Sequence, residues 1–399
     1  MSTTGRRVPT VSLQRLPALD GLRGVAALMV VLTHAAFLPG FSGRSRLDGQ
    51  LLARGDFGVA IFFALSGFLL HRLMLHEVDS SGRLNILGYA VRRFARVVPA
   101  YWVTLAALTI ATRPEARDVV LHAVSGQIYV ADSMMTAFGQ SWSVATEISF
   151  YAALPLIVLS LTRLRSRHPS LPLAVLSALL VVTSLLGFVV GPAWLGEDVI
   201  LERLLPWRAP HFLVGMIFAE AAITHRSRIS RWLRGLADQP GGCLALAGAA
   251  YLAATTPLAG SLLLEPAHGT ALVLRTFFAT VVAAGLLLPL ALGRRSGWSE
   301  VLSRTGARWL GAISYGVFLW HLPVLEAILH VTGAPVFRGG ILPLLALGLP
   351  ISLFLGALSH RFVEVPASRL AARLVRRGGQ HQRRDEQDTD RPFEPRRSG

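Results

Sequence analysis

The sequence predicts an all-α membrane protein, a polytopic bundle of about ten transmembrane helices with both termini in the cytoplasm. Of the 399 residues, 52% are hydrophobic and 16% are charged, and the mean hydropathy is +0.51. This composition is too apolar for an ordinary soluble enzyme. The apolar residues fall in runs of about twenty, the length that spans a bilayer as a helix. Arginines also alternate in density from loop to loop, as the positive-inside rule describes.

The apolar runs define the expected spans in order. They are approximately 19–37, 57–76, 94–112, 142–162, 171–191, 205–223, 243–258, 270–292, 309–331 and 341–366. The connections alternate between arginine-rich and arginine-poor. Arg163, Arg165 and Arg167 follow the fourth span, whereas the 259–269 connection contains no arginine. We therefore expect the former connection in the cytoplasm and the latter outside.

The sequence predicts different structures for the two ends of the chain. The N-terminus lacks a short apolar core followed by a small-residue cleavage site, so the first span is expected to remain as an anchor. Residues 1–368 are expected to form the membrane domain. Residues 369–399 begin as a basic amphipathic extension and end in a stretch too poor in apolar residues to fold. We expect this segment to be a disordered cytoplasmic tail.

The net charge of +16 and the pI near 11.4 do not indicate a nucleic-acid partner. The basic residues lie in short loops between apolar spans, whereas nucleic-acid domains gather them on one face or arm. The expected partner is the lipid bilayer. The single cysteine, Cys243, excludes a multi-cysteine metal site. Zinc-ligand spacings and the GxxxxGK[ST], GxSxG and HExxH motifs are absent from the sequence, which argues against a metal site, an NTPase and a hydrolase.

Charged residues inside the first span are the strongest functional signal, because an ionisable group in the membrane is costly. Arg23 and His34 are 11 residues apart. In an α-helix, this spacing places the two residues on nearly the same face, about 16 Å apart along the axis. We expect the two side chains to line one cavity at two depths. The alternatives are an interfacial Arg23 paired with Asp20, and a His34 that only bonds a neighbouring carbonyl.

Glu147 lies less than two turns into the fourth span, after Trp142 at its expected outer end. Counted from that end, Glu147 reaches the depth of His34, so the two are expected to meet. A carboxylate that orients an imidazole suits a general base that takes a proton from an alcohol. The alternative for Glu147 is a structural hydrogen bond between helices. Trp142 is expected at the membrane interface, next to the substrate.

Arginines gather at the expected cytoplasmic end of the third span. Arg93 and Arg96 are three residues apart, and guanidinium groups bind phosphate bidentately, so this cluster can hold a phosphorylated cosubstrate. The alternative is an ordinary positive-inside signal. Arg361, near the end of the last span, either extends the cluster or pairs with Glu364.

Two further stretches add candidate substrate contacts. In FGVAIFFALSGFLLHR, small residues favour close helix packing, and Ser66 can also line the cavity. In ISYGVFLWHLPV, Tyr315 and His321 are six residues apart and so lie on largely opposite faces. For His321, a cavity-lining role and a structural role are equally open.

The sequence resembles the acyltransferase 3 family of integral-membrane O-acyltransferases. LPALDGLRGVAALMVVLTHA matches its opening motif, with ten residues between the arginine and the histidine. FFALSGFLL, RRFARVVPAYW, SWSVATEISFY and ISYGVFLWHLPV match its other stretches in order, and the likeness covers residues 16 to 366. Val144 stands where leucine is usual and Phe318 where tyrosine is frequent, which leaves acceptor detail open but removes no proposed catalytic group.

The resemblance implies transfer of an acyl group, commonly acetyl, from cytoplasmic acyl-CoA to a hydroxyl of a sugar-containing acceptor. It assigns Arg23, His34 and Glu147 to catalysis, and Arg93 and Arg96 to the donor. Acyl-CoA would be a cosubstrate, and no permanently bound cofactor is expected. The protein is expected in a bacterial inner (plasma) membrane.

Several alternatives remain open at this stage. The acceptor is a cell-envelope polysaccharide or lipid-linked glycan, or alternatively a glycosylated secondary metabolite such as a macrolide. The rival function from another class is a proton-coupled secondary transporter, because intramembrane histidine, glutamate and arginine also serve as proton relays. The sequence leaves open the acyl chain length, the membrane face, direct or covalent transfer, and the oligomeric state.

Overall fold

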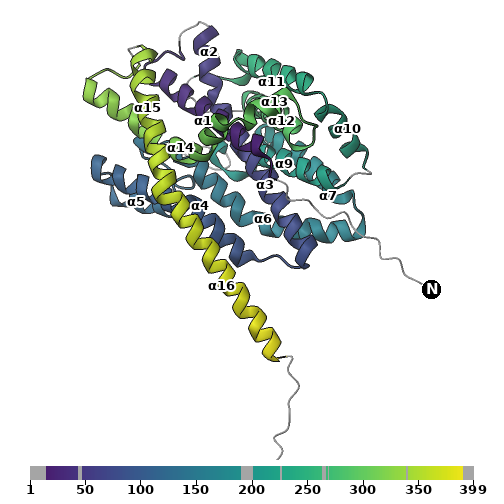
Figure 1. The fold of residues 1–399 in the computed structure, drawn as a ribbon. Coiled ribbons are helices and arrows are strands. Elements are labelled where there is room, and N and C mark those ends of the chain that lie inside the picture. The colour runs from purple at the N-terminus through teal and green to yellow at the C-terminus, as the bar shows by residue number, and fades with distance from the viewer. Residues whose placement is uncertain are drawn as a thin grey trace, which may run out of the picture.

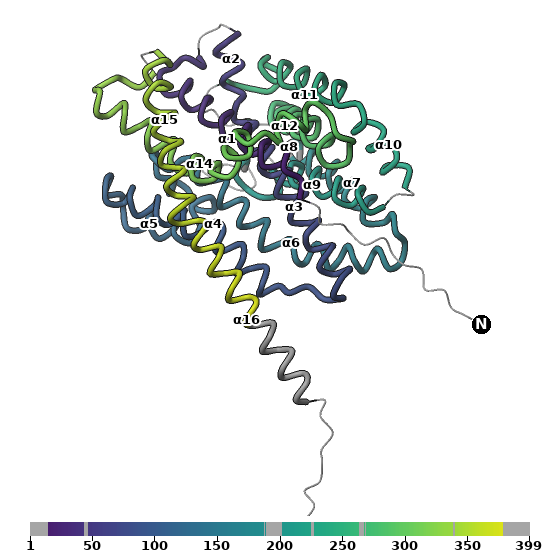
Figure 2. The backbone as a smooth tube through the Cα atoms, viewed as in Figure 1, coloured from purple at the N-terminus to yellow at the C-terminus, as the bar shows by residue number. Residues whose placement is uncertain are grey.

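The computed structural model describes residues 15–43, 47–189, 201–224, 227–262, 267, 269–337 and 340–389. These residues form helices, turns and irregular segments, with no strand among them. The helices make a bundle from which the C-terminal helix projects (Figures 1 and 2). The all-α membrane fold expected from the apolar runs is confirmed.

The α-helices follow one another with short connections. They are α1 Pro17–Phe37, α2 Leu47–Ala53, α3 Gly58–Ser81, α4 Ile86–Thr112, α5 Ala116–Ala123, α6 Ser141–Arg167, α7 Leu171–Ser184, α8 Leu186–Val189, α9 Leu205–Ile223, α10 Arg228–Ala237, α11 Pro240–Ala254, α12 Gly269–Ala291, α13 Gly297–Ser303, α14 Thr305–Thr332, α15 Ile341–Ser359 and α16 Val365–Thr389. Short 3₁₀ segments include η1 Arg54–Phe57, η2 Thr136–Phe138, η4 Leu201–Arg203 and η5 Pro257–Ala259, and a π-helical turn, η6, covers His360–Glu364.

Each of the ten expected spans coincides with a helix or a pair of helices, but their lengths differ. In the described residues, seven helical segments are long and apolar enough to cross a membrane. The expected spans at 171–191 and 243–258 correspond to shorter apolar helices, α7 with α8 and α11, and the end of the former lies outside the described residues. The expected span at 205–223 corresponds to α9, which is also not among the seven. Length and composition therefore support a multi-pass membrane protein.

Close approach between central helices depends on small residues. Helices α1, α3, α9, α12 and α14 lie in the middle of the bundle (Figure 1). A Cβ atom at Gly67 of α3 would overlap the carbonyl oxygen of Phe212 in α9, and one at Gly215 would overlap that of Ala64. Backbones approach this closely where small residues leave room. The close packing expected of the small residues in FGVAIFFALSGFLLHR is confirmed at Gly67.

Helix α6 begins deep inside the protein. Gln140, directly before it, is 3% exposed and donates through Nε2 to the carbonyl of Leu319 in α14 at 2.8 Å. Gln127 donates through Nε2 to the hydroxyl of Ser141 at 3.3 Å, and Ser141 is fully buried. The first turn of α6 therefore lies at the level of the middle of α14 rather than at a surface.

The last helix crosses the expected domain boundary. Helix α16 runs continuously from Val365 to Thr389, past residue 368. Its first part packs against α4, and Ala371 is 3% exposed. The predicted tail therefore begins as helix, and its residues 390–399 lie outside the described residues.

A buried ion-pair network joins α3, α6 and α9. Glu220 accepts hydrogen bonds from Nε2 of His71 at 2.8 Å and from the Arg165 guanidinium at 2.6 Å, and the side chains of His71 and Glu220 are fully buried. Removing one partner of a buried pair leaves the other without compensation, which typically costs about 3–5 kcal/mol. The network therefore stabilises the contact of these three helices.

We expect Glu220→Gln to lower the apparent unfolding temperature of the detergent-solubilised protein, because Arg165 loses its buried counter-charge. Thermal unfolding followed by tryptophan fluorescence measures this effect. Arg294→Gln is the control. The Arg294 side chain is 90% exposed and its ion pair with Asp238 is long, at 4.0 Å, so its loss should have little effect on stability. Equal unfolding temperatures for wild type and Glu220→Gln would show that the network contributes nothing to stability.

Candidate active site

A pocket lies between α1, α3, α4, α6 and α14. Its polar lining combines arginine, serine and tyrosine side chains with one carboxylate: Arg23, Ser66, Arg93, Arg96, Ser143, Glu147, Tyr151, Ser314 and Tyr315. Its apolar lining includes Val59, Phe62, Phe63, Leu69, Leu70, Val97, Val144 and Phe318. Six of the residues expected from the sequence therefore meet in one place: Arg23, Ser66, Arg93, Arg96, Glu147 and Tyr315.

The arginines give the pocket a positive charge. Arg96 forms an ion pair with the buried Glu364 at 3.3 Å, outside the pocket lining. Arg23 has no ion-pair or hydrogen-bond partner in the described part of the chain. The Nε atom of Arg93 is buried and has no hydrogen-bond partner among the described residues. Guanidinium groups with free donors suit an anionic ligand such as a phosphate.

Glu147 lines this pocket and does not pair with His34. One carboxylate oxygen, Oε1, accepts hydrogen bonds from the Ser66 hydroxyl and, at 2.7 Å, from the Tyr151 hydroxyl. No hydrogen bond joins Glu147 to His34 within the described ranges. The expected pairing of the two is wrong. The depth of Glu147 was counted from an assumed membrane surface, whereas the first turn of α6 is itself buried beside Leu319.

His34 instead forms a pair with His321. The Nδ1 atom of His34 lies 2.9 Å from the Val30 carbonyl and 3.3 Å from Nε2 of His321, and the two rings are 5.0 Å apart. The Nδ1 atom of His321 lies 2.7 Å from the Phe318 carbonyl. Both Nδ1 atoms therefore carry the proton in the neutral rings, because each faces a carbonyl acceptor. The Nε2 atom of His34 has no partner in the described structure and is left as the basic nitrogen.

Phenylalanine side chains lie between the pocket arginines and the histidine pair. Phe62 and Phe318 line the pocket with ring centroids 6.0 Å apart, and Phe318 also lies 5.7 Å from the His321 ring. Val30, one turn before His34, packs in the same cluster. His34 is not among the residues that line the pocket, so the expectation that Arg23 and His34 line one cavity is not met.

The other residues that the sequence analysis named as candidates make the following contacts. The Tyr315 hydroxyl donates to the Val97 carbonyl at 2.9 Å. Trp142 lies outside the pocket lining, with the Arg208 guanidinium 4.9 Å from its ring centroid. Arg361 is exposed and lies over the Phe362 ring at 5.6 Å, so neither of its expected contacts forms. Asp20 pairs with Arg15 at 3.5 Å rather than with Arg23.

The structure adds Tyr151 and Ser143, which the sequence analysis missed. Tyr151 follows Glu147 by four residues, so the helical spacing places them on one face. That spacing was an available signal. Ser143 lines the pocket because the α6 start is buried, which no pattern in the sequence indicates.

We expect Glu147→Gln to keep most of the activity, because a glutamine Oε1 can accept both hydrogen bonds made by Oε1 of Glu147. Glu147→Ala should reduce turnover more, since it leaves two hydroxyls without an acceptor at about 1–3 kcal/mol each. Steady-state rates of acyl transfer, the reaction that the resemblance implies, check this for both variants. A Glu147→Gln variant as inactive as Glu147→Ala would mean that the charge itself is required.

Comparisons with known proteins identify the family of the chain. The sequence profile of the acyltransferase 3 family, an acyltransferase domain, matches residues 16–359. A peptidoglycan O-acetyltransferase, OatA, of Listeria monocytogenes is 26% identical over 90% of this chain and 57% of its own length. The putative peptidoglycan O-acetyltransferase YrhL of Bacillus subtilis is 27% identical over 88% of this chain and 54% of its own. The O-acetyltransferase OatA of Staphylococcus aureus is 24% identical over 88% and 57%. The chain thus spans little more than half the length of these relatives. No solved structure is significantly similar to it.

Proposed function

Because the chain belongs to the acyltransferase 3 family, we propose that it is a multi-pass membrane O-acyltransferase that moves an acetyl group from acyl-CoA to a hydroxyl of a cell-wall sugar polymer. The single observation that carries the proposal is the pairing of a guanidinium-lined pocket with a histidine whose Nε2 is free. The relatives' names, which specify O-acetylation and in two cases peptidoglycan, support the acceptor. The bacterial inner membrane is the proposed location.

The anionic part of the donor binds at the pocket. Arg23 and Arg93 offer free guanidinium donors, and Arg96 adds a third positive charge. The long, thin pantetheine arm of CoA passes the Phe62 and Phe318 side chains and brings the thioester to His34. Arg23 and His34 are separated by about 16 Å along α1, a span that such an arm can bridge.

His34 acts as the general base. Its Nε2 takes the proton from the acceptor hydroxyl while the oxygen attacks the thioester carbonyl carbon. The carbon–sulfur bond then breaks, and the CoA thiolate takes the proton back from the imidazolium. His321 positions the base, because its Nε2 lone pair faces Nδ1 of His34 and favours the tautomer with a free Nε2. Holding both reactants beside this nitrogen supplies the orientation that transfer needs.

The test is release of CoA thiol from acetyl-CoA by the protein purified in nanodiscs, with sugar acceptors present or absent. Acceptor-dependent release with acetyl recovered on the sugar is the expected result. A folded protein that releases no thiol with any acceptor would overturn the proposal and favour a transport function.

A further inference from the structure

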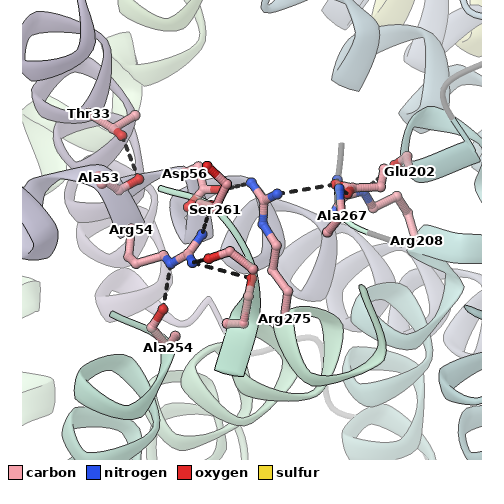
Figure 3. Close-up of polar contacts among 12 residues, drawn as sticks. Thr33, Ala53, Arg54, Asp56, Glu202, Arg208, Ala254, Ser261, Ala267 and Arg275 are labelled. Atoms are coloured by element: carbon pink, nitrogen blue, oxygen red, sulfur yellow. Dashed lines mark hydrogen bonds and ion pairs between the residues drawn. The ribbon is translucent and has the colours of Figure 1, made fainter. Parts of the chain in front are cut away.

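A row of charged side chains of alternating sign lies near His34 and outside the pocket. In order they are Asp56 in η1, Arg275 in α12, Glu202 in η4 and Arg208 in α9, and we call them the charged row (Figure 3). Arg275 lies 2.6 Å from Asp56 and 3.5 Å from Glu202, and Arg208 lies 3.2 Å from Glu202. All four belong to connections or helix ends that the arginine distribution predicts on the outer side.

Most polar atoms of the charged row are satisfied within the protein. Glu202 accepts from the Ala267 amide at 2.7 Å through one oxygen and from both arginines through the other. Arg208 also donates through Nε to the Glu202 carbonyl. The exception is Oδ1 of Asp56, which is buried and has no hydrogen-bond partner among the described residues. An unpaired carboxylate oxygen at such a place needs a donor that the described residues do not supply, and a ligand hydroxyl can provide one.

Asp56 lies against the turn of α1 that carries His34. The Thr33 hydroxyl donates to the Ala53 carbonyl at 2.9 Å (Figure 3). A Cβ atom at Gly55, the residue before Asp56, would lie 3.1 Å from that of Thr33. The charged row therefore starts beside the base and leads away from it.

The charges of the charged row suit a different ligand from the one that the pocket suits. The pocket has three arginines and one carboxylate, whereas the row has two of each. Carboxylates repel a phosphate, but together with guanidinium groups they match the hydroxyls of a sugar, which both donate and accept. The Asp56 and Arg275 side chains keep 32% and 18% exposure, so a ligand can reach the exposed part of each side chain, whereas Oδ1 of Asp56 is itself buried and becomes reachable only after a small local rearrangement.

We propose that Asp56 and Arg275 bind the hydroxyl groups of the carbohydrate acceptor next to His34. Asp56 accepts from a sugar hydroxyl, and Arg275 donates to another. Glu202 and Arg208 hold Arg275 in place, and Arg54, bonded to the carbonyls of Ala254, Ala259 and Gly260, anchors η1. This inference rests on the proposed function, since it names where the acceptor of that reaction binds.

A purely structural role of the same ion pair is the competing explanation, so binding and stability are measured separately. Wild type, Asp56→Asn and Arg275→Gln are titrated in nanodiscs with chitotetraose, a neutral N-acetylglucosamine tetramer, without any donor. Acetyl-CoA binding to the same samples shows that each variant is folded. Glu220→Gln is the matched control, because it breaks a buried ion pair that shares no residue with the charged row.

The proposal predicts that each charged-row variant binds chitotetraose at least about tenfold more weakly while its affinity for acetyl-CoA stays the same. Glu220→Gln should unfold at a lower temperature yet keep its affinity for chitotetraose. Unchanged chitotetraose binding in Asp56→Asn and Arg275→Gln, or no binding to wild type at millimolar concentration, would overturn the proposal. The proposed function is tested apart from this, since it fails only if wild type transfers no acetyl group.

Discussion

The His34→Ala variant is expected to lose acetyl transfer by about 10²- to 10⁴-fold in turnover, the contribution typical of a positioned general base. The reason is the free Nε2 atom of His34, the one imidazole nitrogen of the pair without a partner in the described structure. Acetyl-CoA binding should be unchanged, because His34 does not line the pocket. Steady-state kinetics with saturating acceptor, together with donor titration, measure both quantities.

Two substitutions of His321 test whether this residue positions His34. His321→Gln keeps an acceptor near Nδ1 of His34, whereas His321→Ala removes it. We expect His321→Gln to retain more turnover than His321→Ala, with both variants folded. Turnover in His34→Ala equal to wild type would place the base elsewhere.

Replacing Arg23 and Arg93 by glutamine is expected to raise the KM for the acyl donor by about 10- to 100-fold for each residue, as for the loss of a hydrogen bond to a charged group. Turnover at saturating donor should change little, because neither side chain contacts His34. Initial rates over a range of acetyl-CoA concentrations measure the change.

Arg361→Gln is the matched control for the pocket arginines. Arg361 is exposed against Phe362 and does not line the pocket, so its removal should leave the KM for the donor unchanged. A KM that rises equally in Arg361→Gln and Arg23→Gln would mean that general surface charge, and not the pocket, attracts the donor.

The fold could be predicted from the sequence because apolar runs of membrane length have few other structures available. The number of full-length spans could not. Helices α7 and α11 are apolar but shorter than a span, and hydropathy alone does not reveal where a turn such as Ser184–Leu185 ends a helix. The small residues around Gly67 were interpreted correctly because close helix contact depends on local composition.

The site was predicted in part, and the errors have two causes. Arg23, Arg93 and Arg96 were identified from charge inside or beside a span, a signal that is local. The partner of Glu147 depends on depth, and depth was counted from the wrong origin because Gln140 and Ser141 are buried. The pairing of His34 with His321 joins residues 287 apart in the sequence, and no local pattern specifies it.

The charged row was missed for a related reason. Asp56 and Glu202 lie in predicted connections, where charged residues are ordinary and attract no attention. Only the three-dimensional arrangement shows that they alternate with Arg275 and Arg208 and that one carboxylate oxygen stays unpaired.

The most direct test of the account is a cryo-electron microscopy structure of the protein in nanodiscs with a non-hydrolysable thioether analogue of acetyl-CoA. We expect density for the phosphates against Arg23, Arg93 and Arg96, and the acyl end beside Nε2 of His34. Phosphates bound away from these arginines, or an acyl end held at Glu147 with His34 out of reach, would contradict it.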